Sequence, residues 1–166
     1  MKIIVAVTKN WGIGCRGNLL FNIPEDMKFF RETTLNKIVI MGHNTLKSMP
    51  NGKPLKDRVN IVISADNSLE IDGAIVCNSV SETLEKVKDY NTDDVFVIGG
   101  QTVYEQFLDY CKIALITKIE ESIDADTFFP NIDEMPNWRQ IAMSGANYHE
   151  DIKFRFTIYE NSNLMD

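Results

Sequence analysis

The chain has 166 residues, of which 44% are hydrophobic and 25% charged, and its formal net charge is -7 at pH 7. This size and composition are typical of one globular unit, so we expect a single domain over residues 1–166, acting as a monomer in the cytoplasm. The negative charge argues against nucleic-acid and anionic-membrane partners, and three widely spaced cysteines with only two histidines favour neither a disulfide framework nor a metal site.

The chain begins with a predicted central strand. Lys2 to Thr8 is rich in β-branched residues and nearly continuously apolar, which suits a strand buried on both faces. The segment Gly12 to Gly17, GIGCRG, matches the pattern GxGxxG, but a dinucleotide fingerprint needs a helix that starts within the glycines and an acid after the next strand. Neither follows here, so we interpret these glycines as a loop that can change shape or press its backbone against a ligand.

A helix is predicted from Pro24, because proline suits the first helical position. At 3.6 residues per turn, an apolar face is predicted through Ile23, Met27, Phe30 and Thr34, and Asp26 falls on the Phe30 side. Two interpretations of Asp26 stay open. It either stabilises the helix N-terminal dipole, or it is a partly buried carboxylate with a raised pKa that faces a cavity.

Two segments share the order strand, glycine, helix. The strand Lys37 to Met41 leads through Gly42 into a short helix that ends near Met49, and Asp94 to Ile98 leads through Gly99-Gly100 into a helix from Gln101 to about Tyr110. Free N–H groups at such helix N-termini suit phosphate, although either unit alone is also an ordinary turn. Two units in one sheet predict a seat for the two phosphates of a dinucleotide.

The remaining predicted elements complete an α/β pattern. Strands are expected at Val59 to Ile63, Ala74 to Cys77 and Ile113 to Ile119, and Ser79 with Glu82 forms a capping box for a helix. The segments Trp138 to Met143 and Phe154 to Glu160 alternate with period two, which predicts an antiparallel hairpin at the sheet edge.

In order and spacing, several segments resemble the dihydrofolate reductase family over nearly the whole chain. They are AVTKNWGIGCRGNLLFNIPEDMKFFR, IVIMGHNT, PLKDRVNIVIS, VFVIGGQTVYEQF and DADTFFP. The resemblance implies an α/β fold with an eight-stranded, mostly parallel central sheet, a C-terminal antiparallel hairpin and four flanking helices. It also implies NADPH-dependent reduction of 7,8-dihydrofolate to 5,6,7,8-tetrahydrofolate, in support of one-carbon metabolism, and antifolate inhibitors as further ligands.

By position, the resemblance implies roles for individual residues. Asp26 is the active-site acid that hydrogen-bonds the pterin ring, Thr117 hydrogen-bonds Asp26, and Tyr104 is a catalytic residue near the nicotinamide. Arg58 forms a bidentate pair with the α-carboxylate of the folate glutamate. The residues implied to line the pterin and benzoyl pocket are Val5, Met27, Phe30, Met49, Leu55 and Ile98.

For NADPH, the resemblance implies that the backbone of Ala6 and Ile13 meets the nicotinamide amide. The loop Gly12 to Leu20 is the expected lid that excludes water. The other implied cofactor-binding residues are Gly14, Leu19, Gly42, His43, Asn44, Thr45, Ser64, Gly99, Gly100, Gln101 and Thr102.

The chain departs from the family pattern at three places. Leu20-Phe21 stands where the family usually has Pro-Trp, and phenylalanine has no N–H for an active-site water. His43 stands where an arginine commonly contacts the adenosine 2′-phosphate, and Gln101-Thr102 supplies no arginine on that side either.

Two other functions are compatible with the residues. One is a reductase of the same fold that acts on another pterin or on a riboflavin precursor, for which Arg58 would have no carboxylate to bind. The other is a degenerate nucleotide-binding module, which the departures at Phe21 and His43 favour.

Overall fold

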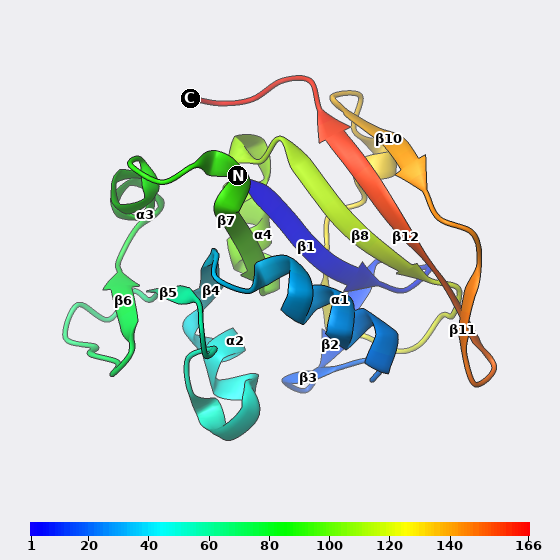
Figure 1. Ribbon diagram of the computed structural model, residues 1–166, viewed down its shortest axis with the longest axis horizontal. Coiled ribbons are helices and arrows are strands. Elements are labelled where there is room, and N and C mark those ends of the chain that lie inside the picture. The colour runs from blue at the N-terminus through cyan, green and yellow to red at the C-terminus, as the bar shows by residue number, and fades with distance from the viewer.

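The apolar segments predicted as strands lie side by side in one large twisted sheet (Figure 1). The computed structural model describes residues 1–166. The strands of this sheet are β1 (Lys2–Val7), β4 (Ile38–Gly42), β5 (Val59–Ile63), β6 (Ala74–Cys77), β7 (Val95–Gly99), β8 (Ile113–Ile119), β10 (Trp138–Met143), β11 (Asn147–His149) and β12 (Ile152–Asn161). Their order across the sheet is β10-β12-β8-β1-β7-β4-β5-β6, with β11 paired only to β12.

The predicted sheet type is confirmed. The pairs β1–β7, β1–β8, β4–β5, β4–β7 and β5–β6 are parallel, whereas the three pairs that involve β12 are antiparallel. Eight strands form the main path, as the resemblance implies, and the short β11 is an additional ninth strand. Because the parallel strands end at one edge of the sheet, the loops that follow them gather there, where ligands bind in open α/β sheets.

The sheet is covered by helices on both faces. They are α1 (Pro24–Thr34), α2 (His43–Ser48), α3 (Val80–Val87) and α4 (Gln101–Phe107). Side chains from α1 and α2 pack in one apolar cluster with Ile4 and Val39, and side chains from α3 and α4 pack in another with Ile3. Neighbouring strand residues point to opposite faces, so α1 and α2 cover one face and α3 and α4 the other. No helix is long and apolar enough to span a membrane.

Local signals placed the helix ends correctly. Pro24 is the first residue of α1, as predicted. At α3 the Ser79 hydroxyl accepts the N–H of Glu82 at 3.0 Å, which is one half of the predicted capping box. The other half differs, because the Glu82 carboxylate accepts the N–H of Asn78 at 2.7 Å instead of that of Ser79.

The glycine loop near the start is not irregular. It forms a hairpin of β2 (Gly12–Cys15) and β3 (Asn18–Leu19), and β2 also pairs with β9 (Thr127–Phe128) in a second, three-stranded sheet. No strand pattern in the sequence predicts this sheet, because its strands are two to four residues long and the partner of β2 lies more than 100 residues away.

Candidate active site

The acid of the first helical turn faces the sheet. The Thr117 hydroxyl on β8 donates a hydrogen bond to Asp26 Oδ1 over 2.6 Å, as the family resemblance implies. Asp26 caps no backbone N–H of α1 with its side chain. Burial raises the pKa of Asp26 from its ordinary value, and the hydrogen bond from Thr117 lowers that pKa in part. Asp26 is therefore a partly buried carboxylate that is held by Thr117, 91 residues away. This arrangement favours the second interpretation of Asp26 over a role limited to the helix dipole.

The raised pKa of Asp26 has a consequence for stability. The folded state binds this proton more tightly than the unfolded state, so the free energy of unfolding falls as pH rises from the ordinary value of 3.8 through the folded pKa, and the loss persists above it. We expect Asp26→Asn to raise the melting temperature by roughly 2–4 °C at pH 7, because the amide needs no desolvated charge. Below pH 3.8 the gain should vanish, since both side chains are then neutral.

Thermal unfolding followed by circular dichroism at pH 3.5 and pH 7 checks this expectation. Glu25→Gln is a matched control, because the Glu25 side chain is 51% exposed on the same helical turn. An equal change of melting temperature for Asp26→Asn at both pH values would show that the burial of the charge is not the cause.

The buried face of α1 differs from the predicted one. Met27, which we predicted on the apolar face, is 53% exposed. Phe29, which we did not predict there, packs on Phe156 of β12 with ring centroids 4.8 Å apart, and Phe30 packs on the α1 side of the sheet as expected. The prediction was wrong at Met27 because the residues that pack against a helix, and not its own apolar stripe alone, decide which side chains are covered: Phe156 of β12 covers Phe29.

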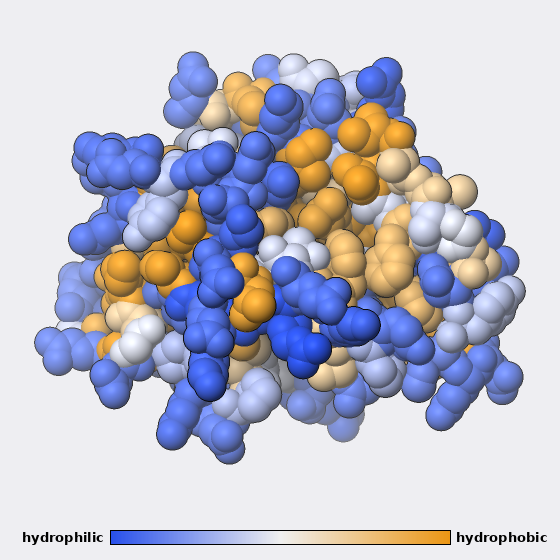
Figure 2. Space-filling view, in the orientation of Figure 1, coloured by the Kyte–Doolittle hydropathy of each residue, from blue (hydrophilic) through white to orange (hydrophobic).

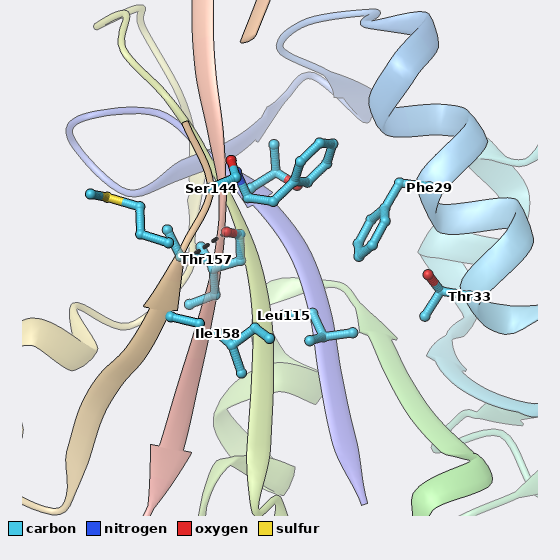
Figure 3. A pocket seen from close by; sticks show the side chains of 11 residues that line it. Phe29, Thr33, Leu115, Ser144, Thr157 and Ile158 are labelled. Carbon is cyan, nitrogen blue, oxygen red and sulfur yellow. Dashed lines mark hydrogen bonds between the residues drawn. The ribbon is translucent and has the colours of Figure 1, made fainter. Parts of the chain in front are cut away.

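A cavity of about 500 Å³ lies between α1 and the strands β8, β10 and β12. Phe29 and Thr33 of α1 face Leu115 and Ile158 across it (Figure 3). Apolar residues also gather on this face of the molecule, over β8 and β12 (Figure 2). Thr117 lines the cavity, but no other predicted site residue does, so this space is separate from the predicted substrate pocket.

Most of the predicted pocket residues come together on the α1 face of the sheet. Phe30, Met49 and Leu55 pack against the apolar cluster that contains Ile98. Val5 belongs to the other cluster, together with Tyr104, so its side chain is part of the opposite core layer. Only the family resemblance predicted that the six residues share one pocket. In the structure, Phe30, Met49, Leu55 and Ile98 lie together, and Val5 does not join them.

Arg58 is held at the C-terminal end of α1. Its Nε donates to Thr34 Oγ1 at 3.2 Å, Nη1 to the Lys56 carbonyl at 2.8 Å, and Nη2 to the Arg31 carbonyl at 3.2 Å. A guanidinium has five N–H groups, so one remains free on each terminal nitrogen. These two donors match the two oxygens of a carboxylate. Burial lowers the pKa of Arg58, but a guanidinium stays protonated in proteins.

Two glycine turns lie against each other at the ends of β4 and β7. The strands are parallel neighbours, with Met41 paired to Gly99. A Cβ on Gly100 would come within 3.3 Å of Thr45 Oγ1, and one on Gly42 within 3.2 Å of Val103. The first turns of α2 and α4 therefore approach closely at these glycines, where a side chain would be crowded. The N–H groups of such helix N-termini are of the kind that phosphates prefer.

Tyr104 of α4 is buried beneath the second of these turns. Its hydroxyl donates to the Ile4 carbonyl at 2.8 Å, and burial raises the pKa of the phenol, so it stays protonated. Gly99 has a φ of 121°, and a Cβ there would lie 3.2 Å from the Tyr104 ring. The Tyr104 ring and its hydrogen bond thus fix the backbone of β1 and of the glycine turn relative to each other.

The hairpin β2–β3 is fastened by a residue that the sequence analysis missed. The Asp126 carboxylate accepts the N–H of Arg16 at 2.8 Å, and the N–H of Asp126 donates to the Gly14 carbonyl at 3.0 Å. Arg16 and Gly17 form the turn with φ values of 52° and 79°, and the first is unusual for a side chain other than glycine or asparagine. Asp126 lies in the quoted motif DADTFFP, but nothing local indicates that it holds a loop 110 residues away.

We expect Asp126→Ala to lower kcat roughly tenfold, because the predicted lid would close less often in the geometry needed for reaction. Asp126→Asn is the matched control, since its side-chain oxygen still accepts from Arg16. Amide hydrogen exchange should be faster at Gly14 and Arg16 in the alanine variant only. An alanine variant with normal exchange and normal kcat would contradict this role.

His43 and Ser64 follow two neighbouring strands and lie at one corner of the main sheet. Gly42 pairs with Ile63 in the register of β4 and β5, so the residues that follow them are neighbours. Gln101 is engaged elsewhere, because its side-chain oxygen accepts the N–H of Phe128 in β9 at 2.9 Å. Of the predicted cofactor residues, Gln101 is therefore tied to the second sheet, whereas His43 and Ser64 share one corner of the main sheet.

Comparisons with known proteins show the family of the chain. A family model described as dihydrofolate reductase matches residues 1–161. The dihydrofolate reductase of Drosophila melanogaster is 34% identical over 177 residues, which cover 96% of this chain and 96% of that protein. The dihydrofolate reductase of Buchnera aphidicola subsp. Baizongia pistaciae is 33% identical over 158 residues, covering 95% and 93% of the two chains.

Longer relatives and a solved structure match as well. The bifunctional dihydrofolate reductase-thymidylate synthase of Glycine max is 32% identical over 175 residues, and this match covers 95% of the present chain but 33% of that protein. The chain thus spans about a third of the bifunctional relatives. The structure of dihydrofolate reductase from Enterococcus faecalis, complexed with NADP(H) and RAB-propyl, superposes with a TM-score of 0.87 at 28% identity, over 98% of this chain and 96% of that one.

Proposed function

Because this chain belongs to the dihydrofolate reductase family, we propose that it catalyses the NADPH-dependent reduction of 7,8-dihydrofolate to 5,6,7,8-tetrahydrofolate, and so supports one-carbon metabolism. The observation that carries the proposal is the partly buried carboxylate of Asp26, held by Thr117 on the same face of the sheet as Phe30, Met49, Leu55 and Ile98. A buried carboxylate beside an apolar pocket suits a flat heterocycle that presents N–H donors.

Asp26 is proposed to bind the pterin ring. Its carboxylate accepts hydrogen bonds from the ring N3–H and the 2-amino group, and its negative charge favours the form of the substrate that is protonated at N5. Thr117 positions the carboxylate, because its hydroxyl already donates to Oδ1. Asp26 thus acts on the charge that develops during reduction, and it does so from a partly buried position.

The substrate tail is proposed to end at Arg58. The two N–H groups that Arg58 leaves free donate to the α-carboxylate of the glutamate, while Thr34 and two backbone carbonyls hold the guanidinium in place. The apolar side chains between Asp26 and Arg58 then contact the pterin and benzoyl groups. Val5 and Met27 are also proposed to line this pocket, because they occupy the matching positions of the family pattern. Met27 would do so from an exposed position on α1.

The cofactor is proposed to lie along the carboxyl ends of β1, β7, β4 and β5. When bound, NADPH supplies the hydride that goes to C6 of the substrate. The diphosphate contacts the backbone of Gly42 to Thr45 and Gly99 to Thr102, and the backbone of Ala6 and Ile13 orients the nicotinamide amide. Gly14 and Leu19 of the hairpin cover it and exclude water, and Tyr104 fixes the strand beneath it. His43 and Ser64 contact the adenosine end.

An assay of purified protein tests the proposal. Absorbance of NADPH at its nicotinamide band should fall only when dihydrofolate is added, with tetrahydrofolate as the product. Absence of any dihydrofolate-dependent oxidation of NADPH would refute the proposed function. We also propose that the protein is a monomer and is located in the cytoplasm. Size-exclusion chromatography with light scattering measures the molar mass in solution and so tests the monomeric state. Antifolates that carry a protonated pyrimidine are proposed as inhibitors, since they would meet Asp26 as the pterin does.

A further inference from the structure

Three parallel strands end together at the corner where the adenosine end is proposed to bind. Gly42 pairs with Ile63, and Ile63 pairs with Cys77, so β4, β5 and β6 end in register. The residues that follow these strands are therefore neighbours in space although they are far apart in the chain. They include His43, Ser64 to Asp66, and Asn78.

Hydrogen bonds hold this corner in one arrangement. The N–H of Ser64 donates to the Cys77 carbonyl at 3.0 Å, and the Asn78 side chain donates to the carbonyls of Ser64 and Asp66 at 2.8 and 3.2 Å. The N–H of Asp66 donates to the Ser64 hydroxyl at 3.2 Å. Asp66 is therefore fixed directly beside the strand ends and is not part of a free loop.

The carboxylate of Asp66 has one oxygen in use and one available. Oδ1 accepts from the N–H and the hydroxyl of Ser68 at 2.9 and 2.6 Å, whereas Oδ2 has no partner in the protein. The hydrogen bonds from Ser68, and to a smaller extent the proximity of His43, lower the pKa of Asp66. A full negative charge with a free acceptor oxygen thus stands next to the only basic side chain of the corner.

The charge balance of the corner does not suit a phosphate. The segments His43 to Thr45, Ser64 to Asp66 and Asn78 to Ser79 contain no arginine or lysine. A 2′-phosphate carries about -1.5 to -2 charges near neutral pH, and neutral imidazole is a weak partner for it. A ribose 2′-hydroxyl, by contrast, can donate to a carboxylate oxygen, which is how dinucleotide sites select a ribose without phosphate.

We propose that Asp66, beside His43 and Ser64, weakens discrimination at the adenosine 2′ position, so that NADH serves this enzyme as a second hydride donor besides NADPH. The inference rests on the proposed function, which places the cofactor in this corner. The reaction balances as it does with NADPH: a hydride carrying two electrons goes to C6, one proton from water goes to N5, and the products are tetrahydrofolate and NAD⁺.

Dissociation constants from isothermal titration calorimetry test the proposal without relying on turnover. With about 10 mM salt, where charges are little screened, the wild-type protein should bind NADH no more than about tenfold more weakly than NADPH. Asp66→Asn should tighten NADPH binding about three- to tenfold, the size expected for one unit charge several ångströms from a phosphate. It should weaken NADH binding about twofold or more, because a neutral amide oxygen is a weaker acceptor for the ribose 2′-hydroxyl than a carboxylate oxygen. High salt should diminish the gain. Asp151→Asn, in the turn after β11 at the opposite edge of the sheet, is the control for an exposed aspartate and should change neither constant.

His43→Arg is a second variant: it adds a positive charge to the corner, whereas Asp66→Asn removes a negative one. It should tighten NADPH binding about tenfold or more and change NADH binding much less, because NADH has no 2′-phosphate for the guanidinium to bind. A wild-type preference for NADPH above about 100-fold, or an Asp66→Asn variant with an unchanged ratio of the two constants, would overturn the inference while the proposed function stands. Failure of both nucleotides to bind would overturn the proposed function itself.

Discussion

Replacing Asp26 with Asn is expected to lower kcat for dihydrofolate at pH 7 by about 100- to 1000-fold, the usual contribution of a positioned acid or of a fixed charge. The amide keeps the size of the side chain and can still accept from Thr117, so the change removes the charge and little else. The dissociation constant of NADPH should stay within about twofold, because the proposed cofactor contacts come from other elements.

The loss of kcat in Asp26→Asn should become smaller as the pH is lowered. If Asp26 acts by favouring the protonated substrate, lowering the pH supplies the same proton from solution, so the deficit of Asp26→Asn should shrink between pH 7 and pH 5. Steady-state rates of both proteins across this range provide the measurement. Glu25→Gln, one residue earlier on the exposed side of α1, should retain normal rates and serves as the control. A normal kcat for Asp26→Asn at pH 7 would mean that Asp26 is only a helix-end acid.

Arg58→Lys is expected to lower kcat/KM for dihydrofolate about 100-fold, mainly through KM. Lysine keeps the positive charge, but a single ammonium cannot hold the Thr34 hydroxyl and two carbonyls while it also presents two parallel donors to a carboxylate. The effect should therefore be much larger than a conservative change of a surface base. Lys56→Gln, a neighbouring exposed residue, should change kcat/KM less than about twofold.

A substrate without the glutamate separates binding from folding. Reduction of a 7,8-dihydropterin that lacks the benzoyl-glutamate tail should be slow in both proteins and nearly the same in wild type and Arg58→Lys. An equal loss for both substrates, together with a lower melting temperature, would show that Arg58 only ties α1 to the chain before β5. That result would also favour a reductase of another pterin or of a riboflavin precursor, because such a substrate has no glutamate carboxylate for Arg58 to bind.

The elements and the identity of the principal acid could be predicted from local rules. A run such as Lys2 to Thr8 is extended because β-branched side chains fit a pleated surface, and α1 begins at Pro24 because proline fits the first helical turn. Asp26 was marked by its place on the apolar side of that helix, although its two interpretations could not be separated. The family motifs favoured the interpretation of Asp26 as an active-site acid, because the resemblance depends on the order and spacing of several distant segments and not on one helix.

Only the tertiary structure decided how residues from different elements meet. Local periodicity predicted Met27 to be buried, but Met27 is 53% exposed in the fold, and Phe29 packs on Phe156 of β12 instead. Asp126 fastens a hairpin 110 residues away, and the register of β4, β5 and β6 places Asp66 beside His43. The sequence by itself determined most strands of the main sheet and the four helices, because these depend on neighbours in the chain, and it marked Asp26 as the candidate acid. The partners of Asp26, Arg58 and Asp66 depend on packing across the sheet, for which adjacent residues carry no signal.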